Sequence, residues 1–155
     1  MELSPSATSI WLQKSRLELK LGRLYDAIDS CTRVVASGTE APGYLRESYL
    51  GRGQTYQRLG KRELALADFQ KSLEVDPTNG NVYNQLAWFL VTGRERTTSD
   101  IEQGVKYARR AVELAPHDAT YRNTLGVALY FSEQWQEAID ALQKSIIAAK
   151  TQKTR

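Results

Sequence analysis

Apolar residues recur along most of the chain at steps of three and four residues, with polar residues between them. This period places apolar side chains on one face of an α-helix and polar side chains on the other. The pattern therefore predicts a succession of amphipathic helices, each with one buried face. The two clearest apolar faces are formed by Leu64, Leu66, Phe69 and Leu73, and by Ile139, Leu142 and Ile146.

Turn-forming residues punctuate these helical segments at regular places. Gly22 and Gly60 are expected in tight turns between two paired helices, where glycine readily ends a helix. Pro77 and Pro116 are expected just after the second helix of a pair, because proline cannot continue a helix. The chain should thus contain helical hairpins, eight helices in all.

A second pattern with a longer period runs through the helical one. A small residue in the first helix of a pair is matched by another small residue in the second helix, usually twelve residues later. We expect each small pair to lie where two helix backbones approach closely, with large residues such as Tyr56, Phe69 and Leu129 filling the space beside them. The pairs are Ser15 with Ala27, Gly53 with Ala65, Ala87 with Gly104, and Gly126 with Ala138.

The starts of the four copies are 38, 34 and 39 residues apart, so a unit of 34 residues carries insertions of four, none and five. The four-residue surplus falls in TEAPGY. The five-residue surplus falls in GRERTTS, between the two helices of the third copy, where Ala87 and Gly104 are seventeen residues apart. Insertions are tolerated best in loops between helices. Ser99 and Glu102 are expected to form a capping box that begins the helix after the inserted loop.

These spacings resemble those of the tetratricopeptide repeat family, most clearly in the second copy, with Tyr49, Gly53, Tyr56, Gly60 and Ala65. The resemblance implies an all-α fold, a right-handed α-solenoid of four helix-turn-helix repeats with eight helices. The first copy departs from the family where it has Lys14 and Glu18. The expected repeats are residues 8–45, 46–79, 80–118 and 119–150, which form a single domain 8–150 between flexible termini 1–7 and 151–155.

Composition indicates a soluble globular protein. The 155 residues are 41% hydrophobic and 25% charged, with a formal net charge of +3 and charges of both signs interspersed. The first residues do not resemble a secretory signal, and no apolar run approaches the roughly 20 residues that span a bilayer. The single cysteine, Cys31, has no partner in the chain, which fits a reducing compartment. We expect a cytoplasmic protein that does not contact membranes.

In proteins of this family the first helix of each repeat lines a concave surface that holds extended peptides or short helices. By matched position, the resemblance implies contact residues that are basic toward one end and carry amide and aromatic side chains toward the other. The cations could meet an acidic ligand or form an ordinary solvated face. The expected contact residues are Arg16, Lys20, Gln54, Arg58, Asn84, Trp88, Asn123 and Tyr130.

Asn84 and Asn123 occupy equivalent positions in the third and fourth repeats. A side-chain amide can donate and accept a hydrogen bond at once, which suits contact with a peptide backbone. Trp88, one helical turn beyond Asn84, could anchor an apolar side chain of a partner or pack against the next repeat. The alternative for both asparagines is an ordinary solvated helix face.

Residues that could carry catalysis or bind a metal are isolated in the sequence. His117 stands alone in a polar turn, and Cys31 falls in a slot that is usually part of the core. Gly51 and Gly53 lie within a helical segment and lack the preceding strand that a phosphate-binding loop requires. We therefore expect no enzyme activity, no metal and no cofactor.

The sequence thus favours a non-enzymatic scaffold or adaptor that binds a peptide or a segment of a partner protein on its concave face. One alternative is a helical-repeat nucleic-acid binder, suggested by the basic residues Lys150, Lys153 and Arg155. Another is a regulatory or accessory region of a larger signalling protein or enzyme complex. Near the C-terminus, Ile146 and Ile147 could dock onto another domain or another copy of the chain, or fold onto the final repeat.

Overall fold

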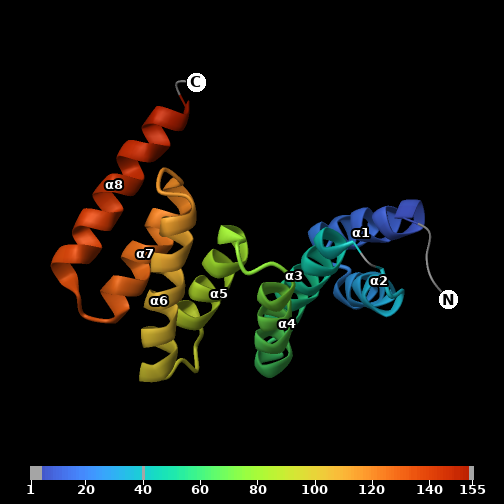
Figure 1. Ribbon diagram of the computed structural model, residues 1–155. Helices are drawn as coiled ribbons and strands as arrows, with labels where there is room; N and C mark the ends of the chain where they lie inside the picture. Colours follow the sequence, from blue (N-terminus) through green and yellow to red (C-terminus); the bar gives the residue numbers. More distant parts are fainter. Residues whose placement is uncertain (1–4, 40, 154–155) are drawn as a thin grey trace. The chain divides into compact units, whose positions relative to one another are not determined.

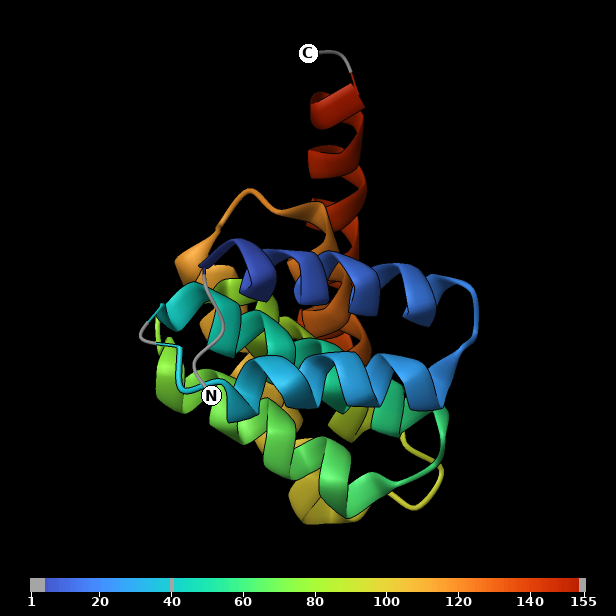
Figure 2. The same cartoon turned by 90° about the vertical axis from the view of Figure 1, so that its right-hand side faces the viewer.

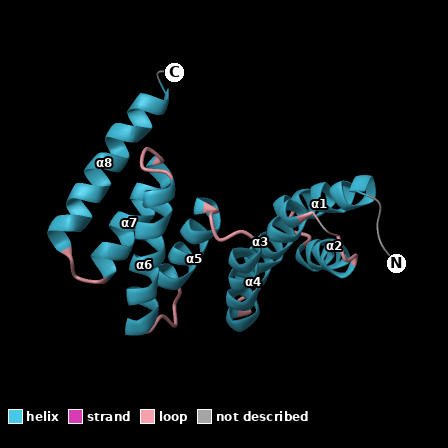
Figure 3. Cartoon of the chain, viewed as in Figure 1, coloured by secondary structure: helices cyan, strands magenta, loops and turns pink. Residues whose placement is uncertain are grey.

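The computed structural model describes residues 5–39 and 41–153, and within them it contains helices and turns but no strand (Figure 1, Figure 3). The prediction of an all-α fold is confirmed, and the eight expected helices are present in this part of the chain. They are α1 (Pro5–Lys20), α2 (Leu24–Ala36), α3 (Pro42–Arg58), α4 (Arg62–Val75), α5 (Gly80–Thr92), α6 (Thr98–Leu114), α7 (Ala119–Phe131) and α8 (Trp135–Lys153).

Consecutive helices pack in pairs, and the chain divides into two compact units of two hairpins each, with the division between Pro77 and Thr78. In the first unit α3 packs on both α1 and α2, and in the second unit α7 packs on both α5 and α6. Figure 2 shows α1 and α2 side by side and antiparallel. The range 8–150, expected as a single domain, spans residues of both units.

Helix boundaries differ from the expected repeat boundaries at three places. Helix α1 begins at Pro5 and α8 ends at Lys153, so helical structure reaches into both segments that were expected as termini. Residues 1–4 and 154–155 of those segments lie outside the described residues. Helix α3 begins at Pro42 after the N-cap Ala41, so the expected boundary between residues 45 and 46 falls inside this helix. Proline suits the first helical turn, because the amide that it lacks has no partner there.

The turns within three of the four hairpins share one backbone feature. Gly22 and Gly60 have φ angles of 74° and 70°, in the left-handed region that glycine enters without strain. The equivalent residue between α7 and α8 is Glu133, with φ 62°. Pro77 and Pro116 follow the ends of α4 and α6, as the sequence predicts.

The small residues lie where the paired helices approach each other. A Cβ atom on Gly53 would stand 2.8 Å from the Phe69 ring and 3.3 Å from the Ala65 carbonyl oxygen. A Cβ atom on Gly126 would stand 3.3 Å from the carbonyl oxygen of Ala138. The 2.8 Å distance is too short for a real contact and the 3.3 Å distances are tighter than most, so the expected close approach is confirmed at both pairs.

In the third hairpin the glycine is on the other helix. Ala87 of α5 is fully buried, and Gly104 of α6 faces it, where an added Cβ would stand 3.4 Å from the Ala87 carbonyl oxygen and would clash with Val91. Either helix of a hairpin can therefore supply the space that the close approach needs.

The helix after the inserted loop begins two residues earlier than the sequence analysis expects. Thr97 is the N-cap of α6: its hydroxyl accepts a hydrogen bond from the amide of Asp100, and the Asp100 carboxylate accepts one from the Thr97 amide at 2.7 Å. The prediction of a capping box by Ser99 and Glu102 is therefore wrong. Ser99 and Glu102 both lie inside α6, after its N-cap, so Ser99 does not cap the helix.

Three members of the two expected apolar faces are exposed, Leu64 on α4 and Ile139 and Ile146 on α8, so their assignment to buried faces is wrong. Phe69 is fully buried and Leu66 and Leu73 are half-buried, but Leu64 is 47% exposed. The buried face of α4 is centred on Ala65 and Phe69, and Leu64 is rotated about 100° from its neighbour around the helix axis. Its assignment to the buried face is therefore wrong.

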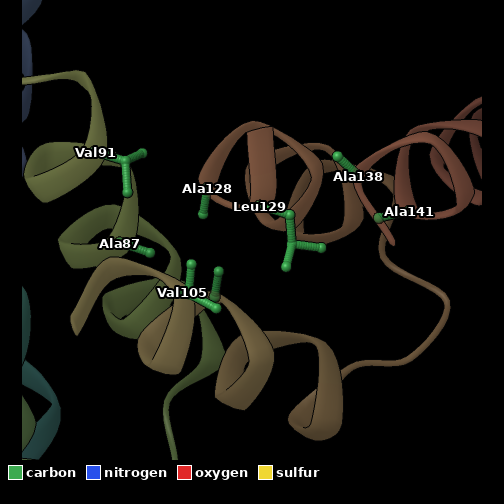
Figure 4. Packing of buried hydrophobic residues seen from close by; sticks show 8 residues of the cluster. Ala87, Val91, Val105, Ala128, Leu129, Ala138 and Ala141 are labelled. Atoms are coloured by element: carbon green, nitrogen blue, oxygen red, sulfur yellow. The ribbon is translucent and has the colours of Figure 1, made fainter. Parts of the chain in front are cut away.

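The core of the second unit joins all four of its helices (Figure 4). Val105 of α6 and Ala128 of α7 belong to the same buried cluster, which also includes Val91 of α5 and Ala138 of α8. This cluster shows how the second helix of one hairpin packs onto the first helix of the next.

Candidate functional site

The expected contact residues of the first unit lie on α1 and α3, the first helix of each of its two hairpins. Arg16 and Lys20 are exposed on α1, Arg58 is exposed on α3, and Gln54 on α3 is half-buried. The guanidinium of Arg16 forms an ion pair with Glu47 of α3. Part of the positive charge expected at this face is therefore neutralised within the unit.

Arg58 has a structural contact as well. Its Nη1 donates a hydrogen bond of 2.8 Å to the carbonyl oxygen of Leu19, one of the last residues of α1. Arg16 and Arg58 thus link the two first helices of this unit, each by one contact. Such use of both arginines accounts for them without a ligand.

In the second unit the two equivalent asparagines lie in different environments. Asn84 on α5 is buried, and its Oδ1 has no hydrogen-bond partner within the described part of the chain. Asn123 on α7 is exposed. Helix α5 is enclosed over most of its surface, with residues such as Val82 and Leu86 fully buried. The shared position therefore does not give the two amides a shared exposure.

Two aromatic side chains on the first helices of this unit are accessible. Trp88 on α5 is 39% exposed, and Tyr130 near the end of α7 is 56% exposed. Asn123 and Tyr130 are seven residues apart, two helical turns, and so share one face of α7. Because α5 and α7 pack against each other, these residues lie on neighbouring first helices.

Tyr130 is part of an aromatic cluster that the sequence analysis does not predict. Its ring contacts Phe131 at a centroid distance of 5.5 Å and Trp135 at 5.3 Å, both edge-to-face. The guanidinium of Arg96, in the inserted loop, stands 4.2 Å from the centre of the Phe131 ring. The sequence does show aromatic residues at both ends of the turn between α7 and α8, and these could have indicated the cluster. The contact with Arg96 required knowledge of where the loop folds.

Cys31 and His117 occupy the environments that the sequence predicts. Cys31 is buried, and burial raises the pKa of its thiol, an effect that a hydrogen bond with Ser15 partly offsets. A protonated, enclosed thiol is a poor nucleophile. His117 is exposed in the turn between α6 and α7.

Neither a metal-binding cluster nor a membrane-spanning helix occurs in the part of the chain that the structure describes. No three histidine, cysteine, aspartate or glutamate residues there gather closely enough to hold a metal ion. None of the helices in residues 5–39 and 41–153 has the length and apolar character needed to cross a bilayer.

The last helix keeps apolar side chains in solvent. Ile146 and Ile147 are both more than half exposed, and Ile139 is 49% exposed. These isoleucines are therefore not folded onto the final repeat, which was one of the two alternatives for Ile146 and Ile147. Helix α8 has 19 residues against 13 in α7, and its C-terminal part extends past its partner (Figure 1).

Known proteins resemble the chain in part of its length. FK506-binding protein-like of Mus musculus is 35% identical over 92 residues, which are 59% of this chain and 25% of that protein. The type IV pilus assembly protein PilF of Pseudomonas aeruginosa is 29% identical over 97 residues, which are 63% of this chain and 36% of PilF. The chain thus spans about a quarter to a third of these curated relatives.

Solved structures share the fold over nearly the whole chain. The structure of Pseudomonas aeruginosa PilF matches with a TM-score of 0.80 at 17% identity and covers 94% of this chain and 62% of that one. YrrB, described as a tetratricopeptide repeat protein with an unusual peptide-binding site, matches with a TM-score of 0.69 at 16% identity and covers 93% of this chain and 70% of that one.

Three family models, each described as a tetratricopeptide repeat, match residues 47–79, 68–103 and 94–153. Together they extend from the second hairpin to the end of α8. The paired helices, the glycine turns and the close approach at small residues are the features on which the resemblance rests. The chain belongs to the tetratricopeptide repeat family.

Proposed function

We propose that this protein is a non-enzymatic interaction module, which binds an extended peptide or a short segment of a partner protein on the first helices of its second unit. The observation that carries the proposal is the exposure of Trp88 and Tyr130 on the neighbouring helices α5 and α7. Aromatic side chains supply large contact areas at low entropic cost and are enriched where binding energy is concentrated.

Asn123 adds a polar group to this surface. It is exposed on the same face of α7 as Tyr130, and its amide can both donate to and accept from a peptide backbone. Asn84 is not part of the proposed surface, because its side chain is buried. We define the binding surface as Trp88, Asn123 and Tyr130.

The first unit contributes less to the proposed site. Arg16 is paired with Glu47, and Arg58 is bonded to the Leu19 carbonyl. Lys20 is exposed and remains available for an acidic residue of a partner. We therefore expect the protein to recognise its partner mainly through apolar and amide contacts.

The distribution of charge supports a protein partner over a nucleic acid. Nucleic-acid binding needs a surface of cations that can reach phosphates. Several arginines of the described chain instead pair with carboxylates: Arg33 with Asp29, Arg109 with Glu137, and Arg110 with Glu113. Labelled single-stranded RNA should accordingly show no salt-sensitive binding to the protein.

The setting of the module is part of the same proposal. A cytoplasmic location is supported by the single cysteine, Cys31, which is buried and has no cysteine partner in the chain. A role within a larger assembly is supported by the similarity to PilF, which is described as a type IV pilus assembly protein.

Selection from a displayed library of random peptides, followed by capture from a cell lysate with mass spectrometry, tests the proposal. The parent should enrich a peptide motif with apolar residues and capture a defined set of proteins. A variant with Trp88→Ala, Asn123→Ala and Tyr130→Ala should lose that motif and most of that set. All three side chains are exposed, so the variant should keep the helical content of the parent.

The control variant is Tyr25→Ala, because Tyr25 is an aromatic on α2 that is still more exposed than Trp88 and Tyr130 and belongs to the other unit. It should enrich and capture as the parent does. If the triple variant retained every peptide and protein, the proposed surface would be rejected.

A further inference from the structure

The first and last helices of the described chain, α1 and α8, each expose an apolar stripe. On α1 the stripe is Ile10 and Leu17, continued by Leu21 just after the end of the helix, and Ile10 is 64% and Leu17 is 57% exposed. On α8 the stripe is Trp135, Ile139 and Ile146, with Ile146 at 57%. Each set follows helical spacing and so lies along one face of its helix. We call these two sets the α1 end face and the α8 end face.

The residues of the α1 end face have equivalents in α3 of the same unit and in α7 of the second unit. Those equivalent side chains are covered by neighbouring helices. The equivalents of Leu17 are Thr55 in α3 and Ala128 in α7, and both are fully buried. Helix α3 packs on the preceding α2, and α7 packs on the preceding α6. The stripe on α1 is exposed because no hairpin of the described chain precedes it.

The α8 end face corresponds to positions that are covered in the other second helices. The equivalents of Ile139 are Val105 in α6, which is buried, and Ile28 in α2, which is half-buried. In the second unit Val105 belongs to the same buried cluster as Ala128 of the following helix α7, and Figure 4 shows the two on facing sides of α6 and α7.

The packing of α6 on α7, in which Val105 and Ala128 share one buried cluster, is therefore the internal form of a contact that the two end faces could make between chains. By position, Ile139 corresponds to Val105 and Leu17 corresponds to Ala128. We infer that the protein self-associates head to tail, with the α8 end face of one copy packed on the α1 end face of a second copy. The second copy would continue the packing that α6 and α7 already show within the chain.

The head-to-tail arrangement would also reproduce a polar contact that is present in the first unit. Arg52 of α3 donates from its Nη1 to the Thr32 hydroxyl of α2 at 3.1 Å, across the packing of one hairpin on the next. The matching residues at the chain ends are Lys14 on α1 and Gln143 on α8. A lysine ammonium can donate to a glutamine carbonyl, so this pair is also complementary in chemistry.

Such an interface joins two different surfaces, so each copy keeps one free end face after it binds. Sedimentation of the parent should show an average mass that rises with concentration above the one-chain mass of 17.5 kDa. Leu17→Glu and Ile139→Glu, each made alone, should sediment at that one-chain mass. Both residues are exposed, and circular dichroism should show parent-like helical content.

Mixing the two variants gives the sharpest test. The Leu17→Glu chain keeps an intact α8 end face and the Ile139→Glu chain keeps an intact α1 end face, so an equimolar mixture should form a species of twice the one-chain mass and grow no further. If α8 instead paired with α8, Leu17→Glu alone would associate like the parent, and the head-to-tail arrangement would be overturned.

Leu64→Glu is the matched control, because Leu64 is an exposed leucine on α4 and belongs to neither end face. It should associate like the parent. A parent that stays at the one-chain mass up to its solubility limit would overturn the inference and would indicate that a different protein covers these faces. The substitutions leave Trp88, Asn123 and Tyr130 intact, so peptide binding can be measured separately.

Discussion

Arg52 and Asp68 form a two-bond ion pair between α3 and α4. The Nε and Nη2 atoms of Arg52 donate to the two carboxylate oxygens of Asp68 at 2.7 and 2.8 Å. Both side chains are largely enclosed, and the bonds to Asp68 raise the pKa of Arg52 further above its ordinary value. The pair places a charged, directional contact inside the first unit, beside the buried Cys31.

Breaking this pair should destabilise the protein more than replacing it. Removing one partner leaves a buried charge without compensation, which typically costs about 3–5 kcal/mol. We expect Arg52→Met to lower the free energy of unfolding by about 3 kcal/mol, toward the lower end because Arg52 is partly exposed. The double variant Arg52→Met with Asp68→Leu should recover most of that loss. Urea unfolding measures both, and equal losses for the two variants would contradict the argument.

Two glycines of α3 should respond oppositely to alanine. On Gly53 the added Cβ would clash with the Phe69 ring, so Gly53→Ala should cost about 1–3 kcal/mol through overpacking. On Gly51 the added Cβ would meet only Cys31 Sγ at 3.6 Å, an ordinary contact. Gly51→Ala should therefore be neutral or stabilise by up to about 1 kcal/mol, the difference in helix propensity. Thermal melts of the two variants check this ordering, and a stabilising Gly53→Ala would show that the helices can separate freely.

Replacing Glu133 by glycine should stabilise the protein. It adopts a φ of 62° in the turn where Gly60 stands in the second hairpin, and the amide of the next residue, Gln134, donates to the Leu129 carbonyl at 3.0 Å. A left-handed conformation costs a non-glycine residue about 1–2 kcal/mol, and the greater freedom of glycine in the unfolded chain offsets about 0.5–1 kcal/mol of any gain.

Glu133→Gly should accordingly raise the free energy of unfolding by about 0.5–1 kcal/mol. Glu133→Ala is the control, since it removes the carboxylate and keeps a Cβ, and it should bring no gain. Denaturant midpoints of the two variants measure the difference. Equal midpoints would mean that the backbone strain at this turn is negligible.

The start of α6 offers a test of which residue caps the helix. Thr97→Ala removes the hydroxyl that accepts from the Asp100 amide and should cost about 1 kcal/mol. Ser99→Ala lies inside the helix and should change stability by less than about 0.5 kcal/mol. The two changes in unfolding free energy can be compared directly. A larger loss for Ser99→Ala would restore the capping box that the sequence pattern suggested.

Burial of Cys31 makes stability depend on pH in the alkaline range. The pKa of its thiol is raised above the ordinary value of 9.0, mainly by burial. The folded protein therefore holds this proton more tightly than the unfolded chain, and the resulting stability is complete below pH 9 and is lost as the pH rises toward the folded pKa.

Cys31→Ala should flatten the decline of unfolding free energy above pH 9, compared with the parent. Other groups titrate in the same range in both proteins, so only the difference between the two slopes is informative. Alkylation of the folded parent at pH 8 should also be slow compared with the urea-unfolded chain. Parallel slopes in parent and variant would contradict a buried, protonated thiol.

Much of the fold could be predicted because its determinants are local. The pairing of Gly53 with Ala65 and the turns at Gly22 and Gly60 follow from spacing and from backbone freedom, which a single sequence displays. The capping box was misplaced because the segment TTSDIE holds two candidate patterns two residues apart. Only the backbone distinguishes Thr97 from Ser99.

The candidate site was predicted less well, because exposure depends on neighbours distant in the sequence. Asn84 and Asn123 have the same position in their repeats, yet one is buried and the other is exposed. Arg16 and Arg58 looked available as cations, and their partners lie 31 and 39 residues away. Sequence spacing identifies the face of a helix but does not show what packs against it.

The reversed pair of Ala87 and Gly104 restricts the order of substitutions by which such a chain can evolve. Moving a glycine from the first helix to the second takes two single changes, and each order passes through a different intermediate. An intermediate with two glycines fits and loses only about 1 kcal/mol of helix propensity. An intermediate with two alanines must force the helices apart. Descent through the double glycine is the less costly route, so space between the helices would have opened before a methyl group filled it from the other side.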